Sequence, residues 1–318
     1  MEVFVKFTTI EFEIHGNAKR PGEHSIALVR LNRPEALNAI TPRMVLELDA
    51  LFDEVRRNSQ LKVVILTGNG HGFCSGGDMR QEGSTLGVTD IDSGLRGPYR
   101  ELAEYFFTDL FHKTMQSCAR KFENLPQVTI AAVNGWAVGA GLELIALADI
   151  RLASDQAKFS EAAVTAGFVT EIGGARNLPK LIGKGRALEM ILTGRVVEAE
   201  EAERIGLVDR VMPHEQLMDA AFELASTIAI QPYLSVLHAK QLVNYYWTQG
   251  ASDKGWTREF EAVREIYHTN DNQEGIRAFL EKRKPVYRGP NYPEYFPNKK
   301  TKTHFTVPVP GEEGKEKR

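Results

Sequence analysis

The stretch VTIAAVNGWAVGAGLELIALADI, residues 128–150, places a strand, a glycine-rich turn and a helix in immediate succession. Its β-branched beginning favours an extended strand, and its Ala- and Leu-rich end favours a helix. The glycines between them let a ligand approach the backbone closely. The unpaired N–H groups at the start of the helix also favour a negatively charged oxygen. This stretch therefore predicts an anion site built from backbone.

A second stretch of the same kind lies earlier in the chain, KVVILTGNGHGFCSGGDM at residues 62–79. Together the two turns can aim two backbone N–H groups at a single oxygen. Such a pair stabilises a carbonyl oxygen that gains negative charge during a reaction, and loss of one donor typically costs about 10²- to 10³-fold in rate. We therefore expect an oxyanion hole formed by both turns.

Four runs of sequence carry a resemblance to a known family: NRPEALNAI at 32–40, FCSGGDM at 73–79, NGWAVGAGLEL at 134–144 and LPKLIGKGRALEMILTGR at 178–195. Over about residues 8 to 286 the chain resembles the crotonase, or enoyl-CoA hydratase/isomerase, superfamily. The resemblance implies an α/β fold, a crotonase-like spiral of repeated ββα units with a C-terminal helical region. It also implies that the N–H groups of Gly77 and Ala140 hold the thioester oxygen of an acyl-CoA.

The expected organisation has three parts. Residues 1–212 form the spiral core with the acyl-CoA site, residues 213–284 form a helical region, and residues 285–318 form a Pro-rich, charged tail. The resemblance implies that the helical region builds a homotrimer or a dimer of trimers. A long polar insertion at 80–100 is expected to cover or edit the binding site.

Composition excludes several classes of function. A formal net charge of −3 leaves no polycationic footprint for nucleic acid or an anionic membrane. Two cysteines are too few for a disulfide framework, and Cys74 is expected to be a packed thiol rather than a nucleophile. The N-terminus resembles a strand and not a signal peptide, so a cytoplasmic protein is expected. The eight histidines show no metal-ligand spacing, so no metal is predicted.

Glu143 lies three residues after Ala140, on the same face of the predicted helix. One interpretation is a glutamate that closes the start of its own helix. The other is a carboxylate beside the thioester, because in hydratases of the superfamily the matching glutamate positions or activates water. With the resemblance, we favour the second.

The second carboxylate of the hydratases is missing. Alignment from Phe159 places it at Ala163, which cannot transfer a proton. Glu171 falls where dienoyl-CoA isomerases and some hydrolases of the superfamily carry an aspartate, and it is the preferred substitute; its alternative is a cap for the following helix. Glu161 is a second candidate, whose alternative is a solvated loop carboxylate. Two carboxylates that flank an enolate can divide proton removal and delivery.

The resemblance also implies where coenzyme A binds as part of the substrate; no separate cofactor is expected. The expected substrate- and CoA-binding residues come from the two turns, the motif before the first helix and a segment near the C-terminus: Ala36, Leu37, Ser75, Gly76, Asp78, Met79, Phe279 and Lys282. Asp78 is expected to order the first turn.

Three functions are compatible with these residues. The first is an acyl-CoA enzyme of the enoyl-CoA hydratase/isomerase type, in fatty acid metabolism or on a bulky acyl group shaped by aromatics such as Trp136, Tyr105 and Phe168. The second is hydrolysis of an acyl-CoA or of a carbon–carbon bond on the same scaffold. The third is RNA binding, known in one branch of the superfamily, which the acidic residues of the helix at 42–57 disfavour.

Overall fold

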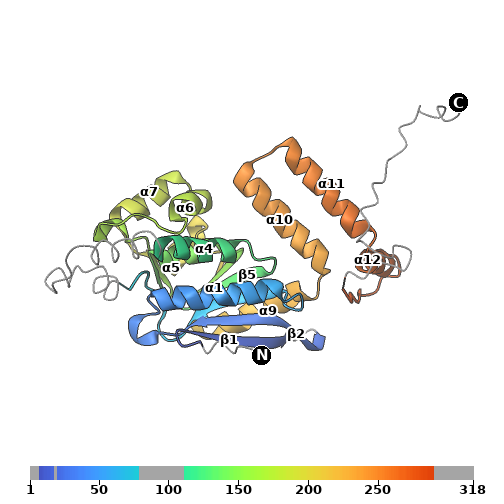
Figure 1. Cartoon of the computed structure of the whole chain (residues 1–318), viewed down its shortest axis with the longest axis horizontal. Coiled ribbons are helices and arrows are strands. Elements are labelled where there is room, and N and C mark those ends of the chain that lie inside the picture. The colour runs from blue at the N-terminus through green and yellow to red at the C-terminus, as the bar shows by residue number, and fades with distance from the viewer. Residues whose placement is uncertain (1–6, 18–19, 79–110, 290–318) are drawn as a thin grey trace, which may run out of the picture. The chain divides into compact units, whose positions relative to one another are not determined.

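The computed structural model describes residues 7–17, 20–78 and 111–289 (Figure 1). The predicted insertion at 80–100, Met79, Tyr105 and the tail from residue 290 onward lie outside the described residues. The chain divides into two compact units, Met1–Gln241 and Leu242–Arg318, and helix α10 (Tyr233–Gln249) runs across the division.

The first unit is built on a six-stranded sheet in the order β1-β2-β3-β5-β7-β10. Its strands are β1 (Ile10–Asn17), β2 (Arg20–Leu31), β3 (Val63–Gly68), β5 (Val128–Val133), β7 (Ile150–Ser154) and β10 (Arg210–Met212). Strands β1 and β2 form an antiparallel hairpin, and every later pairing is parallel. The sequence predicts a polar turn at HGNAKRPGEH, residues 15–24, between these strands. In the structure β1 extends to Asn17 and β2 begins at Arg20, so both strands enter the predicted turn.

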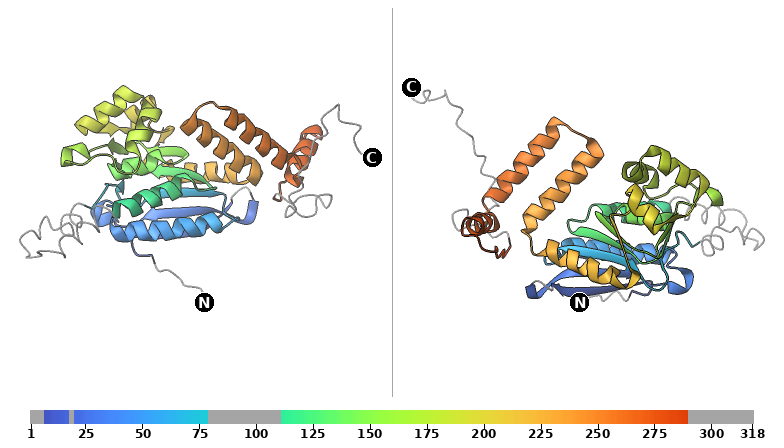
Figure 2. Two further views of the ribbon diagram at one scale, coloured as in Figure 1. Left: turned by 45° about the horizontal axis from the view of Figure 1, so that its top comes forward. Right: turned by 180° about the vertical axis from the view of Figure 1, so that it is seen from behind.

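A smaller, four-stranded sheet has the order β4-β6-β8-β9. Its strands are β4 (Gly72–Cys74), β6 (Trp136–Val138), β8 (Lys158–Ser160) and β9 (Val197–Glu198). The chain passes repeatedly from the large sheet to the small one, from β3 to β4, from β5 to β6 and from β7 to β8. β6 leads directly into α5 (Ala140–Ala146) (Figure 2). The first helix that the structure describes after β4 is α4 (His112–Glu123). This recurrence is the predicted spiral of ββα units.

The sequence DIRLASDQAKFS, residues 149–160, predicts a strand and a hairpin, but no local hairpin forms here. β7 pairs with β5 and β10, whereas β8 pairs with β6 and β9, so the two neighbouring strands belong to different sheets. The prediction is wrong here because a short polar turn fits a hairpin and a change of sheet equally well.

Alternation along the parallel strands separates two hydrophobic cores. Val64 and Leu66 of β3 face one core, which includes α1 (Pro42–Arg57), α4 and α5, while Val63 and Ile65 face the other. Helix α9 (Leu217–Ala229) covers this second face with Leu217, Ala221, Ala225 and Ala229. α9, the first α-helix after the expected boundary at residue 212, therefore packs on the sheet and belongs to the compact unit Met1–Gln241.

Thr41 followed by Pro42 predicts a helix start with threonine as its N-cap, and the start of α1 confirms this prediction. The Thr41 hydroxyl accepts a hydrogen bond of 3.2 Å from the Met44 N–H, and Pro42 occupies the first helical position. The remaining helices of the first unit are α6 (Gly174–Ile182), α7 (Lys184–Thr193) and α8 (Ala199–Ile205), with short 3₁₀ turns η1 (Pro34–Ala36), η3 (Val164–Ala166) and η4 (His214–Gln216).

The second unit contains α11 (Asp253–Tyr267) and α12 (Asn270–Leu280), as the helical prediction for this region requires. Across the described helices, none taken singly has the length and apolarity to cross a membrane. One pair of helices reaches that length and apolarity only when the two are taken together. The pair is His214–Ala229 and Tyr233–Gln249, and it is bent by 109°.

Candidate active site

The two glycine-rich turns lie side by side because the strands that lead into them are paired. β4 and β6 run parallel, with Gly72 opposite Trp136 and Cys74 opposite Ala137. After these strands, Gly76 adopts a φ of 89°, and a Cβ added there would lie 2.9 Å from the Val138 carbonyl oxygen and 3.6 Å from the Ala140 nitrogen. The first turn therefore contacts the backbone of the second.

Gly77 has its N–H on the side of the turn away from Ile40. The Ile40 N–H donates to the Gly76 carbonyl at 2.8 Å, and the Ile40 carbonyl accepts from the Asp78 N–H at 2.9 Å. Since Gly77 lies between these two bonds, alternation turns its own N–H in the opposite direction.

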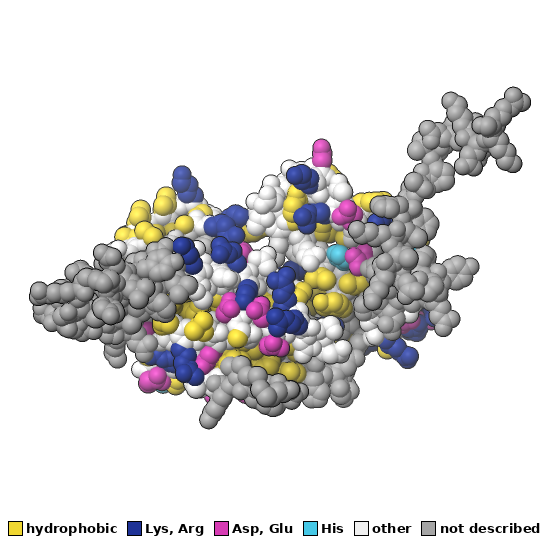
Figure 3. Space-filling model, in the orientation of Figure 1, with side chains coloured by type: hydrophobic (Ala, Val, Ile, Leu, Met, Phe, Trp, Pro, Cys, Tyr) yellow, Lys and Arg dark blue, Asp and Glu magenta, His cyan; other side chains and the backbone are white. Residues whose placement is uncertain are grey.

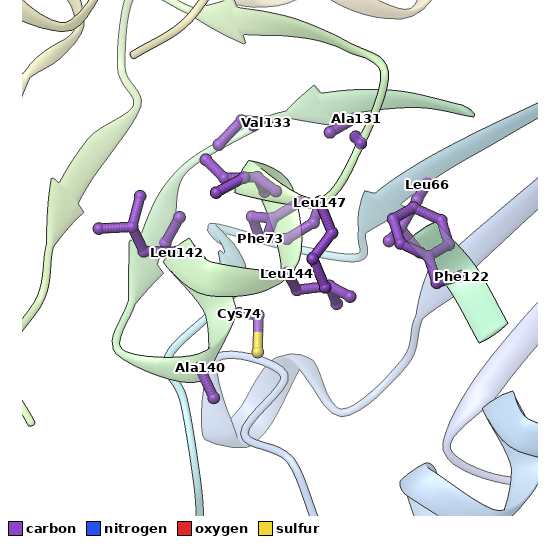
Figure 4. Close-up of a cluster of buried hydrophobic side chains, with 14 of the residues drawn as sticks. Leu66, Phe73, Cys74, Phe122, Ala131, Val133, Ala140, Leu142, Leu144 and Leu147 are labelled. Carbon is purple, nitrogen blue, oxygen red and sulfur yellow. The ribbon is translucent and has the colours of Figure 1, made fainter. Parts of the chain in front are cut away.

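Ala140 is the first residue of α5, so its N–H has no acceptor within the helix. The preceding Gly139 has a φ of 52° and turns the chain sharply from β6 into the helix. Figure 4 shows Cys74 and Ala140 near the beginning of α5, beside the buried Leu142 and Leu144. A Cβ on Gly141 would lie 2.2 Å from the Cys74 carbonyl oxygen, so the close packing of the turns requires glycine here.

Cys74 is a buried, packed thiol, as the sequence predicts. Burial raises the pKa of its thiol to about 12, which keeps it protonated and weakly nucleophilic. The structure thus offers no support for a cysteine nucleophile in the first turn.

Glu143 is almost fully buried in α5 and accepts three backbone hydrogen bonds. Its Oε1 accepts from the Glu171 N–H at 2.9 Å, and its Oε2 accepts from the Ile172 N–H at 2.9 Å and from the Gly174 N–H at 2.6 Å. Glu143 therefore does close a helix N-terminus, but that of α6 and not its own. The contacts hold its carboxylate in one orientation, one turn away from Ala140.

Glu171 does not cap the helix that follows it, because Glu143 does so. Its carboxylate lies instead 3.5 Å from Nε2 of His112, the first residue of α4. Gln116, one turn further along α4, donates to the Glu171 carbonyl at 3.0 Å. Burial raises the pKa of Glu171 above its usual range, opposed by the His112 charge and reinforced by Glu143.

Glu161 is fully buried, so the alternative of a solvated loop carboxylate is wrong. Within the described ranges no hydrogen bond of normal geometry holds either of its oxygens. The Ala163 N–H acts weakly on the carboxyl and opposes the rise in its pKa. Burial raises the pKa of Glu161 to about 8, with further contributions from the negative charges of Glu143 and Glu171. The structure therefore brings three glutamates into electrostatic contact around the second turn.

The position of the missing hydratase carboxylate lies two residues after Glu161. Ala163 directly precedes η3, and its carbonyl accepts from the Phe168 N–H at 2.9 Å. Trp136, expected to shape the acyl pocket, lies at the start of β6 with the Lys158 ammonium 5.5 Å from its ring centroid.

The predicted CoA-binding segments of the first unit adjoin each other. The Ser75 N–H donates to the Leu37 carbonyl at 3.0 Å, and its hydroxyl donates to the Ala36 carbonyl at 3.2 Å. Asp78 is buried and pairs with Arg33 at 2.8 Å, so it links the first turn to the motif before α1.

Phe279 and Lys282, the other predicted CoA contacts, belong to the second unit. The Phe279 side chain is 83% exposed in this chain, and Lys282 has a φ of 54° just after α12.

Sequence reasoning missed two polar side chains that hold the turns. The buried Asn38 donates to the carbonyls of Asn69 and Gly72 at 2.9 and 2.8 Å, and Asn134 accepts from the Gly68 N–H at 3.2 Å. It also missed His112. Asn38 and Asn134 stand within the quoted motifs, whereas nothing in the sequence around His112 marks it.

Comparison with known proteins gives this arrangement a family. A sequence profile described as enoyl-CoA hydratase/isomerase matches residues 22–290. The chain belongs to the enoyl-CoA hydratase/isomerase family. The match spans both glycine-rich turns, the three glutamates and the C-terminal helices, so membership in the crotonase superfamily and its fold, both expected from the motifs, is confirmed.

Individual relatives cover nearly the same region. YngF of Bacillus subtilis is 37% identical over 268 residues, which are 84% of this chain and 95% of that protein. The short-chain-enoyl-CoA hydratase of Clostridium acetobutylicum is 34% identical over 263 residues, 82% of this chain and 94% of that protein. The crystal structure of enoyl-CoA hydratase from Bacillus anthracis matches with a TM-score of 0.75 and 31% identity, covering 88% of this chain and 99% of that one.

Proposed function

We propose that this chain is an acyl-CoA enzyme that stabilises a thioester enolate between the N–H groups of Gly77 and Ala140. The adjacent turns and the orientation of these two residues support the proposal, as does membership in the enoyl-CoA hydratase/isomerase family. Coenzyme A enters as part of the substrate. Two donors aimed at the thioester oxygen stabilise the charge that develops there in the transition state.

Glu143 carries this proposal, because its carboxylate is fixed beside the second turn. A carboxylate has about four lone-pair sites, and three backbone N–H groups occupy most of them. Roughly one site remains to accept a hydrogen bond from water or substrate. Glu143 is therefore suited to orient a reacting group. Glu171, in the segment before α6 whose N–H groups bind Glu143, is the acid–base partner.

For the CoA portion, we propose the adjoining backbone of Ala36, Leu37, Ser75 and Gly76, with Met79, Asp78, Phe279 and Lys282 as further contacts. The hydrogen bonds between Ser75 and the segment of Ala36 and Leu37 support a continuous surface for pantetheine and adenine. Asp78 contributes by ordering this surface through Arg33. The same proposal includes a bulky acyl group on the CoA ester that this enzyme binds.

An assay of the wild type against straight-chain, aromatic and steroid-derived enoyl-CoA esters tests the function. Hydration abolishes the ultraviolet absorbance of the conjugated thioester and adds one water to the mass, whereas isomerisation leaves the mass unchanged. We expect Glu143→Gln to lower turnover by about 10²- to 10⁴-fold while the ester still binds. If no CoA ester binds to the protein and none changes its ultraviolet absorbance, the proposal is wrong.

Hydrolysis is the alternative, with Glu143 or Glu171 activating water. It is separated by the release of free thiol, followed with a colorimetric reagent in the same reactions. The relatives described above carry hydratase names, which favours addition of water or migration of a double bond. RNA binding is disfavoured further by the mixture of basic and acidic side chains on the face shown in Figure 3.

We also propose that the chain assembles as a homotrimer or a dimer of trimers. One face of α11 carries exposed apolar side chains at helical spacing: Trp256, Phe260, Val263 and Tyr267. Exposed apolar faces of this kind mark interaction surfaces. Sedimentation velocity should give the mass of three or six chains, and a monomer at micromolar concentration would contradict this assembly.

A further inference from the structure

Glu161 follows directly after β8, at the edge of the small sheet beside the second glycine-rich turn. β8 pairs in parallel with β6, and the pairing places Ser160 opposite Val138. The register continues past the strands, because the Gly139 N–H donates to the Ser160 carbonyl at 2.9 Å. Glu161 is thus the next residue along this edge, level with the turn that presents the Ala140 N–H.

The side chain of Glu161 is fully buried, and no hydrogen bond of normal geometry holds either of its oxygens among the residues that the structure describes. The backbone N–H of Ala163 acts on the carboxyl only weakly and opposes the rise in its pKa. Buried polar groups in folded proteins are nearly always hydrogen-bonded, so this carboxyl is open to a further partner. Its neighbours in charge are two further glutamates, Glu143 and Glu171, which repel its charged form. An acyl-CoA bound at the second turn would supply the missing contact.

We propose that Glu161 is the proton donor of this enzyme and takes the role of the carboxylate that is absent at Ala163. This assignment rests on the proposed function. A carboxyl group that stays protonated at neutral pH can deliver a proton to carbon, and burial beside two like charges keeps Glu161 in that form. Glu171, which adjoins His112 and is less buried, is left to accept the proton at the start of the reaction.

Hydration of the enoyl-CoA ester by Glu171 and Glu161 needs no reactant other than water. In hydration, Glu171 takes a proton from water as the water oxygen bonds to the β carbon, and the electron pair of the double bond moves to the thioester oxygen. The enolate then collapses, its electron pair forms a bond to the proton of Glu161 at the α carbon, and the thioester carbonyl returns. Proton transfer from Glu171 to Glu161, directly or through solvent, restores both groups.

Two variants test the assignment: Glu161→Gln and Glu54→Gln. Glu54 is a matched control, because its side chain is 75% exposed on α1 and its contact is an ion pair with Arg57. We expect Glu161→Gln to bind the enoyl-CoA ester within a few-fold of wild type while turnover falls by about 10²- to 10⁴-fold. Glu54→Gln should keep full turnover, and retained binding shows that the variant is folded.

Difference infrared spectroscopy gives a second measurement that does not depend on turnover. The wild type at pH 7 should show the C=O stretch of a buried protonated carboxyl, which Glu161→Gln removes and Glu54→Gln keeps. Full turnover in Glu161→Gln, or a carboxylate signal for Glu161 at pH 7, would overturn the assignment while leaving the proposed function intact. A wild type that turns over no enoyl-CoA ester would instead overturn the proposed function and this role together.

Discussion

Glu143 caps a helix to which it does not belong: its Oε2 accepts a hydrogen bond of 2.6 Å from the N–H of Gly174, the first residue of α6. This bond connects the second glycine-rich turn to the segment that carries Glu171. The orientation of one glutamate is therefore set by the backbone around another.

Gly174→Ala should displace the Glu143 carboxylate. A Cβ at this position would lie 2.9 Å from Cγ and 3.0 Å from Oε2 of Glu143. Because the Glu143 carboxylate is buried and accepts three backbone hydrogen bonds, its displacement should cost about 1–3 kcal/mol of stability. A shift of about 1 Å at a catalytic group can also lower the rate by about 10²-fold. Steady-state kinetics with a thermal melt should show a reduced kcat and a lower Tm.

Gly185→Ala is the matched control for that substitution. It lies in α7, where an added Cβ meets nothing within 4 Å. Because Gly185 is the second residue of this exposed helix start, alanine should change stability by less than about 0.5 kcal/mol and should not affect kcat. Equal kinetics for the two variants would mean that the Glu143 orientation does not matter for turnover.

Gly76→Ala should damage the oxyanion hole itself. Its φ of 89° disfavours any side chain, and the new Cβ would lie 2.9 Å from the Val138 carbonyl oxygen, so the first turn must move away from the second. Loss of one aligned donor predicts a fall in kcat of about 10²- to 10³-fold.

Gly167→Ala separates backbone strain from this movement. Its φ of 81° is similar, but nothing lies within 4 Å of an added Cβ. Both variants should lose about 1–2 kcal/mol of stability from the left-handed conformation. Only Gly76→Ala should lose turnover, and a comparable loss in both would assign the effect to general destabilisation.

Local sequence predicts the elements of the fold well because each signal is short in range. The β-branched run of β5, the glycines after β6 and the Ala- and Leu-rich α5 stand within residues 128–150 and specify strand, turn and helix in order. Choice of sheet is not local. β7 and β8 are three residues apart, yet they pair with strands of different sheets, and the predicted hairpin fails for that reason.

The site was predictable in its membership but less so in its contacts. Spacing and resemblance identify both Glu143 and Glu171. The sequence, however, offers Glu171 as the cap of the helix that follows it, whereas Glu143 caps that helix in the structure. The capping bonds join residues 28 to 31 positions apart, beyond the reach of any sequence motif. The burial of Glu161 and the approach of His112 likewise depend on packing between distant elements.

His112→Gln should move the acid limb of the activity profile to higher pH. The described charged groups that act on Glu171 are His112 from α4 and Glu143 from α5, and His112 opposes the increase that burial causes in the Glu171 pKa. Without that positive charge the Glu171 pKa rises further, so the base is protonated at a higher pH. A profile of kcat/KM against pH measures this shift.

The control for the histidine is His214→Gln, because the His214 ring lies 3.1 Å from the Ser154 hydroxyl in a different part of the unit. Its acid limb should coincide with that of the wild type. An unchanged acid limb in His112→Gln would show that Glu171 is not the base or that His112 does not influence it.

Glu161 should make the wild type less stable as pH rises through neutrality. Its pKa is about 8 in the folded chain and 4.5 as a free side chain, because burial disfavours the charged form. Below pH 4.5 the group is protonated in both states and has no effect. Between pH 4.5 and about 8 the unfolded state releases a proton that the folded state keeps, so the free energy of unfolding falls.

Glu161→Gln removes this titration, so the variant should gain stability relative to wild type between pH 5 and pH 8, by on the order of a few kcal/mol. Urea unfolding of both proteins at the two pH values measures the difference. Glu54→Gln, on an exposed side chain, should change the free energy of unfolding by less than about 0.5 kcal/mol at either pH. If the difference between Glu161→Gln and wild type is the same at pH 5 and pH 8, the buried carboxyl does not stay protonated in the folded chain.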